Sequence, residues 1–443
     1  MKLWLKNKDS LNDVTRFTVG NDLEMDLFLA RFDVLGSLAH IQMLESVGLL
    51  TDGELQKLSG ELKNIHARII SGNFRMDDGV EDIHSQVELW LTQKLGDVGK
   101  KIHSGRSRND QVLVDIKLFL REEIETLVNR IRDLFDLLLS KSEEHKDNLL
   151  PGYTHMQLAM PSSFGLWFGA YAESLVDDVI TLQAAYQVVN KNPLGSGAGY
   201  GSSFPLNRTL TTELLGFEDL NYNVVYAQMG RGKMEKIVAS ALSNVAGTLG
   251  KLSTDIALFL NQNFGFISFP DELTTGSSIM PHKKNPDVFE LIRAKCNGIQ
   301  ALPNEIALLA ANLPSGYHRD WQLLKEKIFP AFVTMKECLE AAVLMLSNVS
   351  VKENILDDEK YKYLFSVEEV NKLVLKGVPF RDAYQKIGQD IEKGKFIYTA
   401  SPHHTHEGSM GNLCNHEIVR MMDDVVSKFN FGKAKKALTK LML

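Results

Sequence analysis

The sequence contains little cysteine, and its cysteines form no pattern. Three occur among 443 residues, at positions 296, 338 and 414, without a Cys-x-x-Cys pair. An odd number of widely spaced cysteines argues against a disulfide framework and against a zinc–cysteine site. Such usage is typical of a reducing compartment, so we expect a cytoplasmic protein.

The sequence also lacks a long apolar run and an excess of positive charge. No stretch approaches the roughly 20 apolar residues of a membrane helix, and the first residues are polar, unlike a secretion signal. The formal net charge is -7, which argues against a nucleic-acid partner or an acidic membrane partner. An anionic substrate would therefore need a local cationic pocket.

Long helical patterns dominate what is present. From Gln111 to about Asp147, apolar residues recur every three or four positions without proline or glycine, which corresponds to about 50 Å of helix. This length favours a bundle of long helices over a compact mixed fold. Similar patterns cover 161–190, 233–263, 286–312 and 325–349, and Pro303 is expected to kink or break the fourth helix.

The polar clusters of the sequence lie in loops between these helices. The segment 275–286 combines hydroxyls, two lysines, an asparagine and backbone N–H groups, which suit a carboxylate or an oxyanion. The segment 101–111 places Arg106 and Arg108 just before a helix N-terminus, where an anion would bind. Either cluster could instead be a solvated turn.

Several of these loops carry motifs of one family. Thr275–Pro286 resembles the GSSxMPxKxNP signature of the fumarase/aspartase superfamily. Ser104–Gln111 is similar to the GRSRNDQ motif of argininosuccinate lyases, and Pro151–Gln157 to their PGYTHxQ motif. Further matches lie at 192–199, 313–325 and 376–381. On this similarity, which covers about 33–388, the chain is identified as a member of the argininosuccinate lyase, or delta-crystallin-type, family.

The resemblance implies a mainly α-helical fold of three domains. A small helical N-terminal domain would cover 1–110, the long-helix bundle 111–352 and a small helical C-terminal domain 353–443. Four bundles would assemble into one helical core, giving a homotetramer whose active sites collect loops from three subunits. The pattern agrees, because loops at both ends of long antiparallel helices could not all meet at one end of one bundle.

The resemblance also implies a reaction, the reversible beta-elimination that cleaves argininosuccinate to arginine and fumarate without metal or organic cofactor. A base removes a proton next to a carboxylate, donors hold the resulting carbanion, and an acid protonates the leaving nitrogen. By resemblance Ser277 is the base, an alkoxide that loop N–H groups and Lys283 would have to stabilise. His155 is the acid or orients it, and Glu290 pairs with this histidine.

The remaining matched residues are expected to bind substrate. Lys283 and Asn285 would hold the carboxylate that becomes fumarate, with further contacts from Thr154 and Asn109. The resemblance assigns the carboxylates and the arginine half to Ser107, Arg108, Arg231, Tyr317, Gln322 and Lys325, and a further part of the pocket to Asp82 and His84. Asp82 and His84 could instead cap their helix, and Glu290 could be an ordinary surface residue.

A histidine cluster near the C-terminus resembles a metal site at first sight. His403, His404 and His406 stand beside Glu407. Their spacing is that of a loop and not the i, i+4 helical pair of a zinc enzyme. We therefore expect no metal there, and this loop would instead hold the C-terminal domain near the active site.

The sequence departs from the family at two places. Position 282 is histidine where argininosuccinate lyases usually have glutamine, which resembles adenylosuccinate lyases, enzymes with the same elimination but a purine leaving group. Residues 16–22 depart from a serine-containing segment, so a serine that contacts substrate cannot be placed. Adenylosuccinate lyase therefore stays open as the nearest alternative, aspartase or fumarase fits less well, and a non-enzymatic protein of the delta-crystallin kind is a further alternative.

Overall fold

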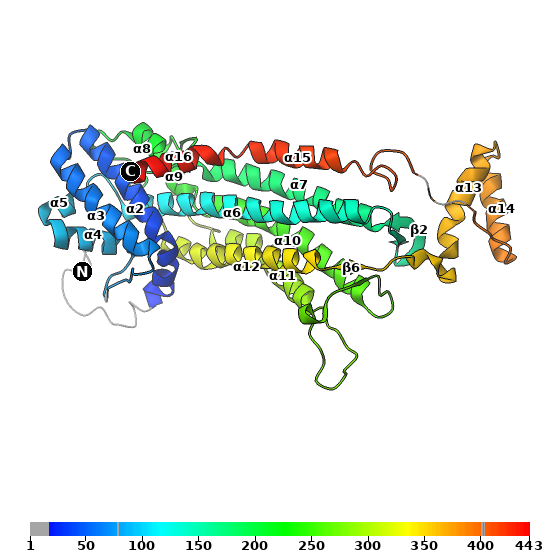
Figure 1. Ribbon diagram of the computed structural model, residues 1–443. Coiled ribbons are helices and arrows are strands. Elements are labelled where there is room, and N and C mark those ends of the chain that lie inside the picture. Colours follow the sequence, from blue (N-terminus) through cyan, green and yellow to red (C-terminus); the bar gives the residue numbers. More distant parts are fainter. Residues whose placement is uncertain (1–16, 78, 400–401, 403) are drawn as a thin grey trace.

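The computed structural model describes residues 17–77, 79–399, 402 and 404–443. The molecule is elongated and mainly helical: N-terminal helices form one end, long helices the middle, and two short helices the other end (Figure 1). The prediction of a mainly α-helical fold is confirmed.

The N-terminal end is built around α2 (Asp22–Ser46). Helices α3 (Asp52–Ile70) and α4 (Ile83–Leu95) and the 3-10 helix η1 (Lys101–His103) pack against α2, and α5 (Asp97–Lys100) connects α4 to η1. Of the helices that the structure describes, α2 alone is long and apolar enough to span a membrane, but 78% of its apolar stretch is buried inside the protein. It is a core helix. Asp26 and Asp33 interrupt its apolar run, so the sequence alone did not indicate how apolar the whole helix is.

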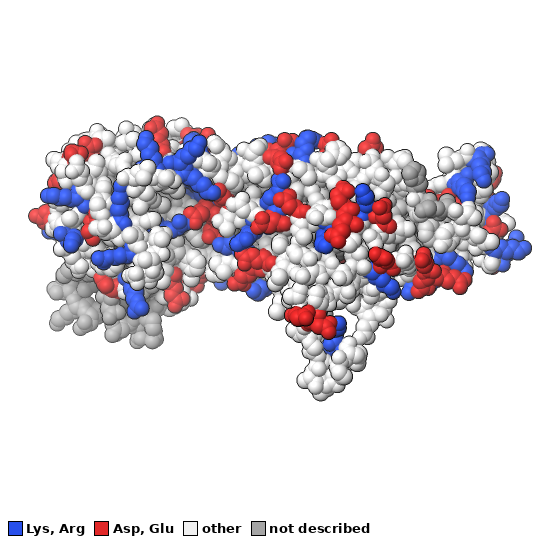
Figure 2. All heavy atoms as spheres, in the orientation of Figure 1, with Lys and Arg blue, Asp and Glu red and all other residues white. Residues whose placement is uncertain are grey.

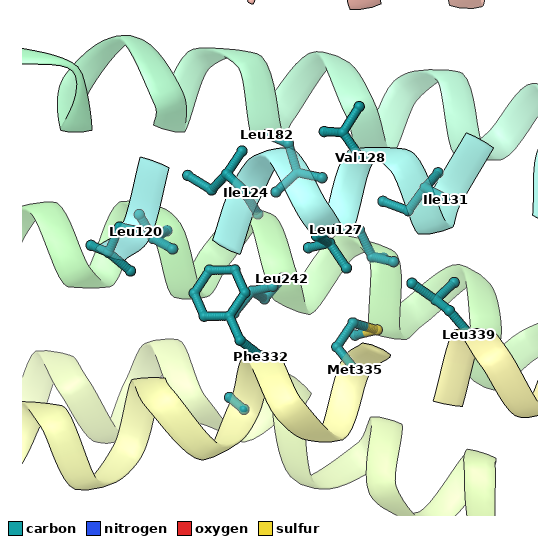
Figure 3. Close-up of a cluster of buried hydrophobic side chains, with 14 of the residues drawn as sticks. Leu120, Ile124, Leu127, Val128, Ile131, Leu182, Leu242, Phe332, Met335 and Leu339 are labelled. Carbon is teal, nitrogen blue, oxygen red and sulfur yellow. The ribbon is translucent and has the colours of Figure 1, made fainter. Parts of the chain in front are cut away.

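Five long helices form the middle of the molecule. They are α6 (Arg108–Glu144), α7 (Phe164–Val189), α10 (Lys233–Leu260), α11 (Asp287–Leu309) and α12 (Leu323–Ser347). Their bounds follow the five helical patterns of the sequence. Buried side chains such as Ile124 of α6, Leu182 of α7 and Phe332 of α12 lie in one cluster (Figure 3), so the predicted apolar face of α6 does form the core.

Two details of these helices correct the prediction. The second long helix begins at Phe164 and not at Pro161, because residues 157–163 form a strand. Helix α11 continues through Pro303 without a break. An interior proline costs about 3 kcal/mol of helix stability, but buried Ile299 and Ile306 anchor the helix on either side of it.

Short elements connect the long helices. Strands β1 (Leu149–Thr154) and β2 (Gln157–Ser163) form an antiparallel hairpin between α6 and α7. The parallel pair β3 (Lys191–Asn192) and β4 (Asp219–Leu220) and the antiparallel pair β5 (Ile267–Ser268) and β6 (Ser350–Val351) are shorter. The remaining connectors are α8 (Arg208–Leu214), α9 (Val224–Met229), and the 3-10 helices η2 (Asp271–Leu273) and η3 (Arg319–Gln322).

The C-terminal region divides between the two ends of the molecule. After η4 (Ile355–Asp357) and η5 (Glu359–Phe365), helices α13 (Ser366–Leu375) and α14 (Phe380–Glu392) form an outlying pair with its own small core. Helix α15 (Asn415–Ser427) then returns along α7, and α16 (Phe431–Met442) reaches α2 and α8 (Figure 1). The predicted domain boundaries at residues 110 and 352 stay predictions.

Candidate active site

A cavity of about 200 Å³ lies where the N-terminal helices meet the bundle. Its wall comes from α2, the starts of α4 and α6, the segment before α10, and the start of α12. Many residues predicted for the site line it: Asp82, His84, Arg108, Asn109, Arg231, Tyr317, Gln322 and Lys325. On the visible surface, acidic and basic side chains are interspersed (Figure 2), so a local cavity of this kind is needed to select an anion.

Arg108 is held by acidic partners at the start of α6. Its guanidinium lies 2.9 Å from Asp82 and 3.7 Å from Glu81, and it donates to Ser85 Oγ at 2.7 Å. Ser107 precedes it as the N-cap of α6, accepting the Asn109 N–H at 3.2 Å. Ser107 does not line the cavity, so its visible role is to cap the helix that presents Arg108 and Asn109.

Lys325 of α12 faces two carboxylates of α2. Its Nζ lies 2.5 Å from Asp22 and 2.6 Å from Asp26, which also accepts the Ile83 N–H at 3.1 Å. Burial and the neighbouring Asp26 raise the pKa of Asp22 to about 6, although Lys325 opposes this. One lysine thus serves two acids of α2 at the wall of the cavity.

Asp82 and His84 have different partners: Asp82 caps α4, and His84 contacts an acid of α2. Asp82 is the N-cap of α4, accepting from the Ser85 N–H at 2.7 Å. Burial would raise the pKa of Asp82, but His84 and Arg108 lower it below its ordinary value. His84 does not cap the helix; its Nδ1 lies 2.7 Å from Asp33. The capping interpretation therefore describes Asp82 and not His84.

The described part of the divergent segment 16–22 contacts residues that line the same cavity. Gln322 donates to the carbonyls of Thr18 and Val19 at 3.1 and 3.0 Å, and Arg319 donates to Thr18 at 2.9 Å. Arg231 is tied to Glu235 at 2.8 Å. The segment that lacks the family serine thus covers the pocket and delivers Asp22 to it, while Arg16 lies outside the described residues.

A second group of predicted residues lies in the loop before α11, which protrudes from the bundle (Figure 1). Thr275 and Asn285 pair at its base. The hydroxyl of Ser277 accepts the N–H groups of Ile279 and Met280 at 3.4 and 3.1 Å. An open recess of about 620 Å³ beside the loop is lined by residues that include His282, Lys283, Asn285 and Glu290.

The third group lies at the tip of the β1–β2 hairpin. Thr154 pairs with Gln157, and His155 and Met156 form the two-residue turn between them. Both turn residues have positive φ, 54° and 59°, as a type I′ turn requires. Left-handed backbone is unfavourable for most side chains, so the hairpin imposes this conformation and directs an exposed His155 outward.

The cavity and the hairpin are far apart in one chain. Arg108 begins α6, and the hairpin follows its other end after 37 helical residues, a separation of about 55 Å. Within the described part of the chain, no hydrogen bond or ion pair joins His155 to Glu290. One chain therefore holds the parts of the predicted site without assembling them.

Sequence reasoning missed several residues of the cavity: Asp22, Asp26, Glu81 and Arg319. A usable signal was present for the first two, because Asp22 and Asp26 stand four residues apart and so share one face of a largely apolar helix. An acid on such a face needs a partner, and Lys325 supplies it.

The histidine cluster near the C-terminus is only partly described. His404 Nε2 lies 3.0 Å from Glu368 of α13, and His406 Nδ1 lies 3.4 Å from the Glu407 carbonyl. His403 lies outside the described residues. Among the described residues, the spacing of a metal site occurs elsewhere, at Asp33, His84 and Asp115.

A family model that covers more than half of the chain shows the class of protein. A family model described as lyase matches residues 12–301. In fold, the chain is similar to a crystal structure of EDDS lyase in complex with formate, with a TM-score of 0.77 and 21% identity, covering 94% of this chain and 90% of that one.

The particular family follows from two curated relatives. The argininosuccinate lyase of Phocaeicola vulgatus is 62% identical over 441 residues, covering 100% of this chain and 99% of the relative. The argininosuccinate lyase of Parabacteroides distasonis is 63% identical over the same shares. The chain belongs to the argininosuccinate lyase family and is a carbon–nitrogen lyase.

Proposed function

We propose that this enzyme catalyses the reversible beta-elimination of argininosuccinate to L-arginine and fumarate, a step of arginine biosynthesis in the cytoplasm. The observation that carries the proposal is full-length identity of 62% to an argininosuccinate lyase. The site residues fit this chemistry, since they provide a supported serine, cationic groups for carboxylates and acids for a cationic leaving group.

Ser277 is the base in this mechanism. A serine hydroxyl ionises only if its anion is stabilised, and the N–H groups of Ile279 and Met280 already point at its oxygen. Lys283 in the same loop adds positive charge. The alkoxide takes the proton next to a carboxylate of the succinyl part, while Lys283 and Asn285 hold the carboxylate that becomes part of fumarate.

His155 supplies or orients the acid for the leaving nitrogen. It is exposed at the hairpin tip, and Glu290 is exposed in the first turn of α11. Each can therefore meet a residue of a neighbouring subunit, and a Glu290–His155 pair formed in this way would favour the charged imidazole that donates a proton. Thr154, beside His155, and Asn109 add contacts on the fumarate side.

The cavity beside α2 holds the rest of the substrate. Arg108, Arg231 and Lys325 face its carboxylates, with Tyr317, Gln322, Asp82 and His84 as further binding positions, while Ser107 caps the helix that presents Arg108. Asp22 and Asp26, which share Lys325, are the acids proposed to face a cationic group of the arginine half. The mechanism uses no metal and no organic cofactor.

The separation of the three groups supports a homotetramer with shared active sites. Arg108 and His155 lie at opposite ends of α6, so a complete site needs more than one copy of the chain. The bundle offers faces for such copies, because Ile180 of α7, Leu291 and Leu308 of α11 and Leu344 of α12 are exposed apolar residues. Neither a nucleic acid nor a membrane is required.

The second candidate, adenylosuccinate lyase, is favoured by His282 alone. Fumarate absorbance distinguishes the two when the enzyme is given argininosuccinate or adenylosuccinate in turn. We expect release from argininosuccinate only. A folded protein that releases no fumarate from argininosuccinate would contradict the proposal, and one inactive on both substrates would favour the delta-crystallin-type alternative.

A further inference from the structure

Three side chains from three helices meet beneath the wall of the cavity. They are Asp33 of α2, His84 of α4 and Asp115 of α6. His84 Nδ1 lies 2.7 Å from Asp33 Oδ1 and 3.7 Å from Asp115 Oδ2. The carboxylates are 2% and 1% exposed, whereas His84 also lines the substrate cavity. One imidazole ring thus connects a buried acid pair to the pocket.

This acid pair is not explained by stability of the fold. Within the described residues, one oxygen of Asp33 and both oxygens of Asp115 are buried without a hydrogen-bond partner. Buried carboxylates with open acceptors are unfavourable, and apolar side chains of similar volume are commonly as stable or more stable at such positions. A site that retains them has a use for their charge.

The charge balance favours a proton over a metal ion. Arg106 is half-buried nearby, donating to Ser37 at 2.9 Å, and its charge acts on both Asp33 and Asp115. If His84 is protonated, the cations His84 and Arg106 face the acids Asp33 and Asp115, although burial and the neighbouring Asp33 raise the pKa of Asp115 well above its ordinary value. A divalent ion in place of the proton would leave an excess of positive charge in a buried cluster, which is unfavourable.

We propose that Asp33 and Asp115 are positioning residues that keep His84 as an imidazolium in the pocket wall, where its second ring N–H binds a substrate carboxylate. The Nδ1–H of His84 donates to Asp33, so its Nε2–H is the donor left for a ligand. The inference rests on the proposed function, because both halves of argininosuccinate carry carboxylates. Either the succinyl part or the amino-acid part can supply the ligand.

The proposal sets a pH range for substrate binding. Burial would lower the pKa of His84, but Asp33, Asp115 and Asp82 together raise it to about 9. The neighbouring cations are His103, Arg106 and Arg108. Since the raised value lies above the ordinary one, the imidazolium is present up to this pH, and carboxylate binding is lost as pH rises through it.

The test measures KM for argininosuccinate between about pH 6 and about pH 10, on either side of the ordinary and raised histidine pKa values. Wild-type KM should rise through pH 9. Asp33→Asn removes the negative charge nearest to His84, so the rise in KM should move to lower pH. At neutral pH its KM should be about tenfold higher than that of the wild type, and kcat should change less. Asp33→Glu should restore the profile. Asp178→Asn, a buried acid of α7, should leave it unchanged.

Competitive inhibition by fumarate and by arginine shows which carboxylate His84 binds, because only that inhibitor should bind more weakly to Asp33→Asn.

If Asp33→Asn does not fold, His84→Gln keeps an amide donor and should make KM independent of pH in this range. A folded Asp33→Asn enzyme with the wild-type profile, or one tightly bound metal ion per chain whose removal changes the profile, would overturn the inference. Wild-type turnover of argininosuccinate tests the proposed function separately.

Discussion

At the scale of single residues, the candidate site consists of charges that already have partners. Lys325 lies between Asp22 and Asp26, Arg108 faces Asp82, and Arg231 faces Glu235. Such pairs hold each charged group in place before the substrate arrives, which lowers the reorganisation that binding requires. Ser277 differs, because its hydroxyl is supported by backbone N–H groups and not by an acid.

The prediction at this scale concerns Ser277. Ser277→Ala removes the proposed base and should lower kcat on the order of 10²–10⁴-fold or more. Melting temperature and substrate binding should stay near wild type, because the side chain lies in a protruding loop and its hydrogen bonds to other described residues stay within its own turn. The measurement is fumarate release with a thermal melt of each variant.

Ser278→Ala is the matched control, since it makes the same change one residue later in the same exposed loop. Turnover near wild type in Ser277→Ala would rule out Ser277 as the base. A comparable loss in Ser278→Ala would show that the loop, and not one hydroxyl, carries the effect.

At the scale of elements, α6 sets where the site residues lie. A capping box joins Ser107 and Asp110 at its start, and Asp110 also accepts the N–H groups of Gly195 and Gly197 at 3.0 and 2.9 Å. These glycines have φ of 84° and 58°, a conformation that other residues rarely adopt. Asp110 at the N-terminus of α6 thus fixes the 104–111 motif against the 192–199 motif.

The β1–β2 hairpin carries the prediction at the element scale. Met156 has left-handed backbone at the turn that presents His155, so Met156→Gly should stabilise the hairpin by about 1 kcal/mol and keep turnover. Met156→Ile places a β-branched residue there and should lower both melting temperature and kcat. Thermal melts and initial rates check this, and an unchanged kcat in Met156→Ile would show that turnover does not depend on this turn.

The elements were predictable to different degrees from the sequence. Periodic apolar residues such as Ile116, Leu120 and Ile124 are buried as expected, because the spacing decides which helix face packs. The hairpin was missed because His155 and Met156 are not the Asn-Gly or Asp-Gly pair that marks such turns. Packing of α11 against its neighbours overrode the local signal of Pro303.

Motifs predicted some of the residues around the cavity, and tertiary contacts brought in others that no motif signalled. Arg108, Lys325 and Tyr317 were predicted from their motifs, and the structure brings them to one cavity. Asp22 was missed because its partner Lys325 is some three hundred residues away in sequence, and only packing of α2 on α12 joins them. The roles of Ser277, His155 and Glu290 stay predictions.

At the scale of the whole molecule, the elongated shape separates the parts of the site. The cavity beside α2, the loop before α11 and the hairpin after α6 are presented in different places along the bundle (Figure 1). If several bundles pack side by side in opposite directions, the end of one chain lies next to the middle or the end of a neighbouring chain. This arrangement predicts active sites that are shared between subunits.

Complementation between two inactive variants tests this claim most directly. Ser277→Ala and Arg108→Met are each expected to lack turnover of argininosuccinate. If Ser277 and Arg108 of one site come from different subunits, unfolding and refolding the two variants together should restore up to about a quarter of wild-type activity at the statistical limit of random mixing. No activity in mixed oligomers, with both variants folded and assembled, would contradict shared sites.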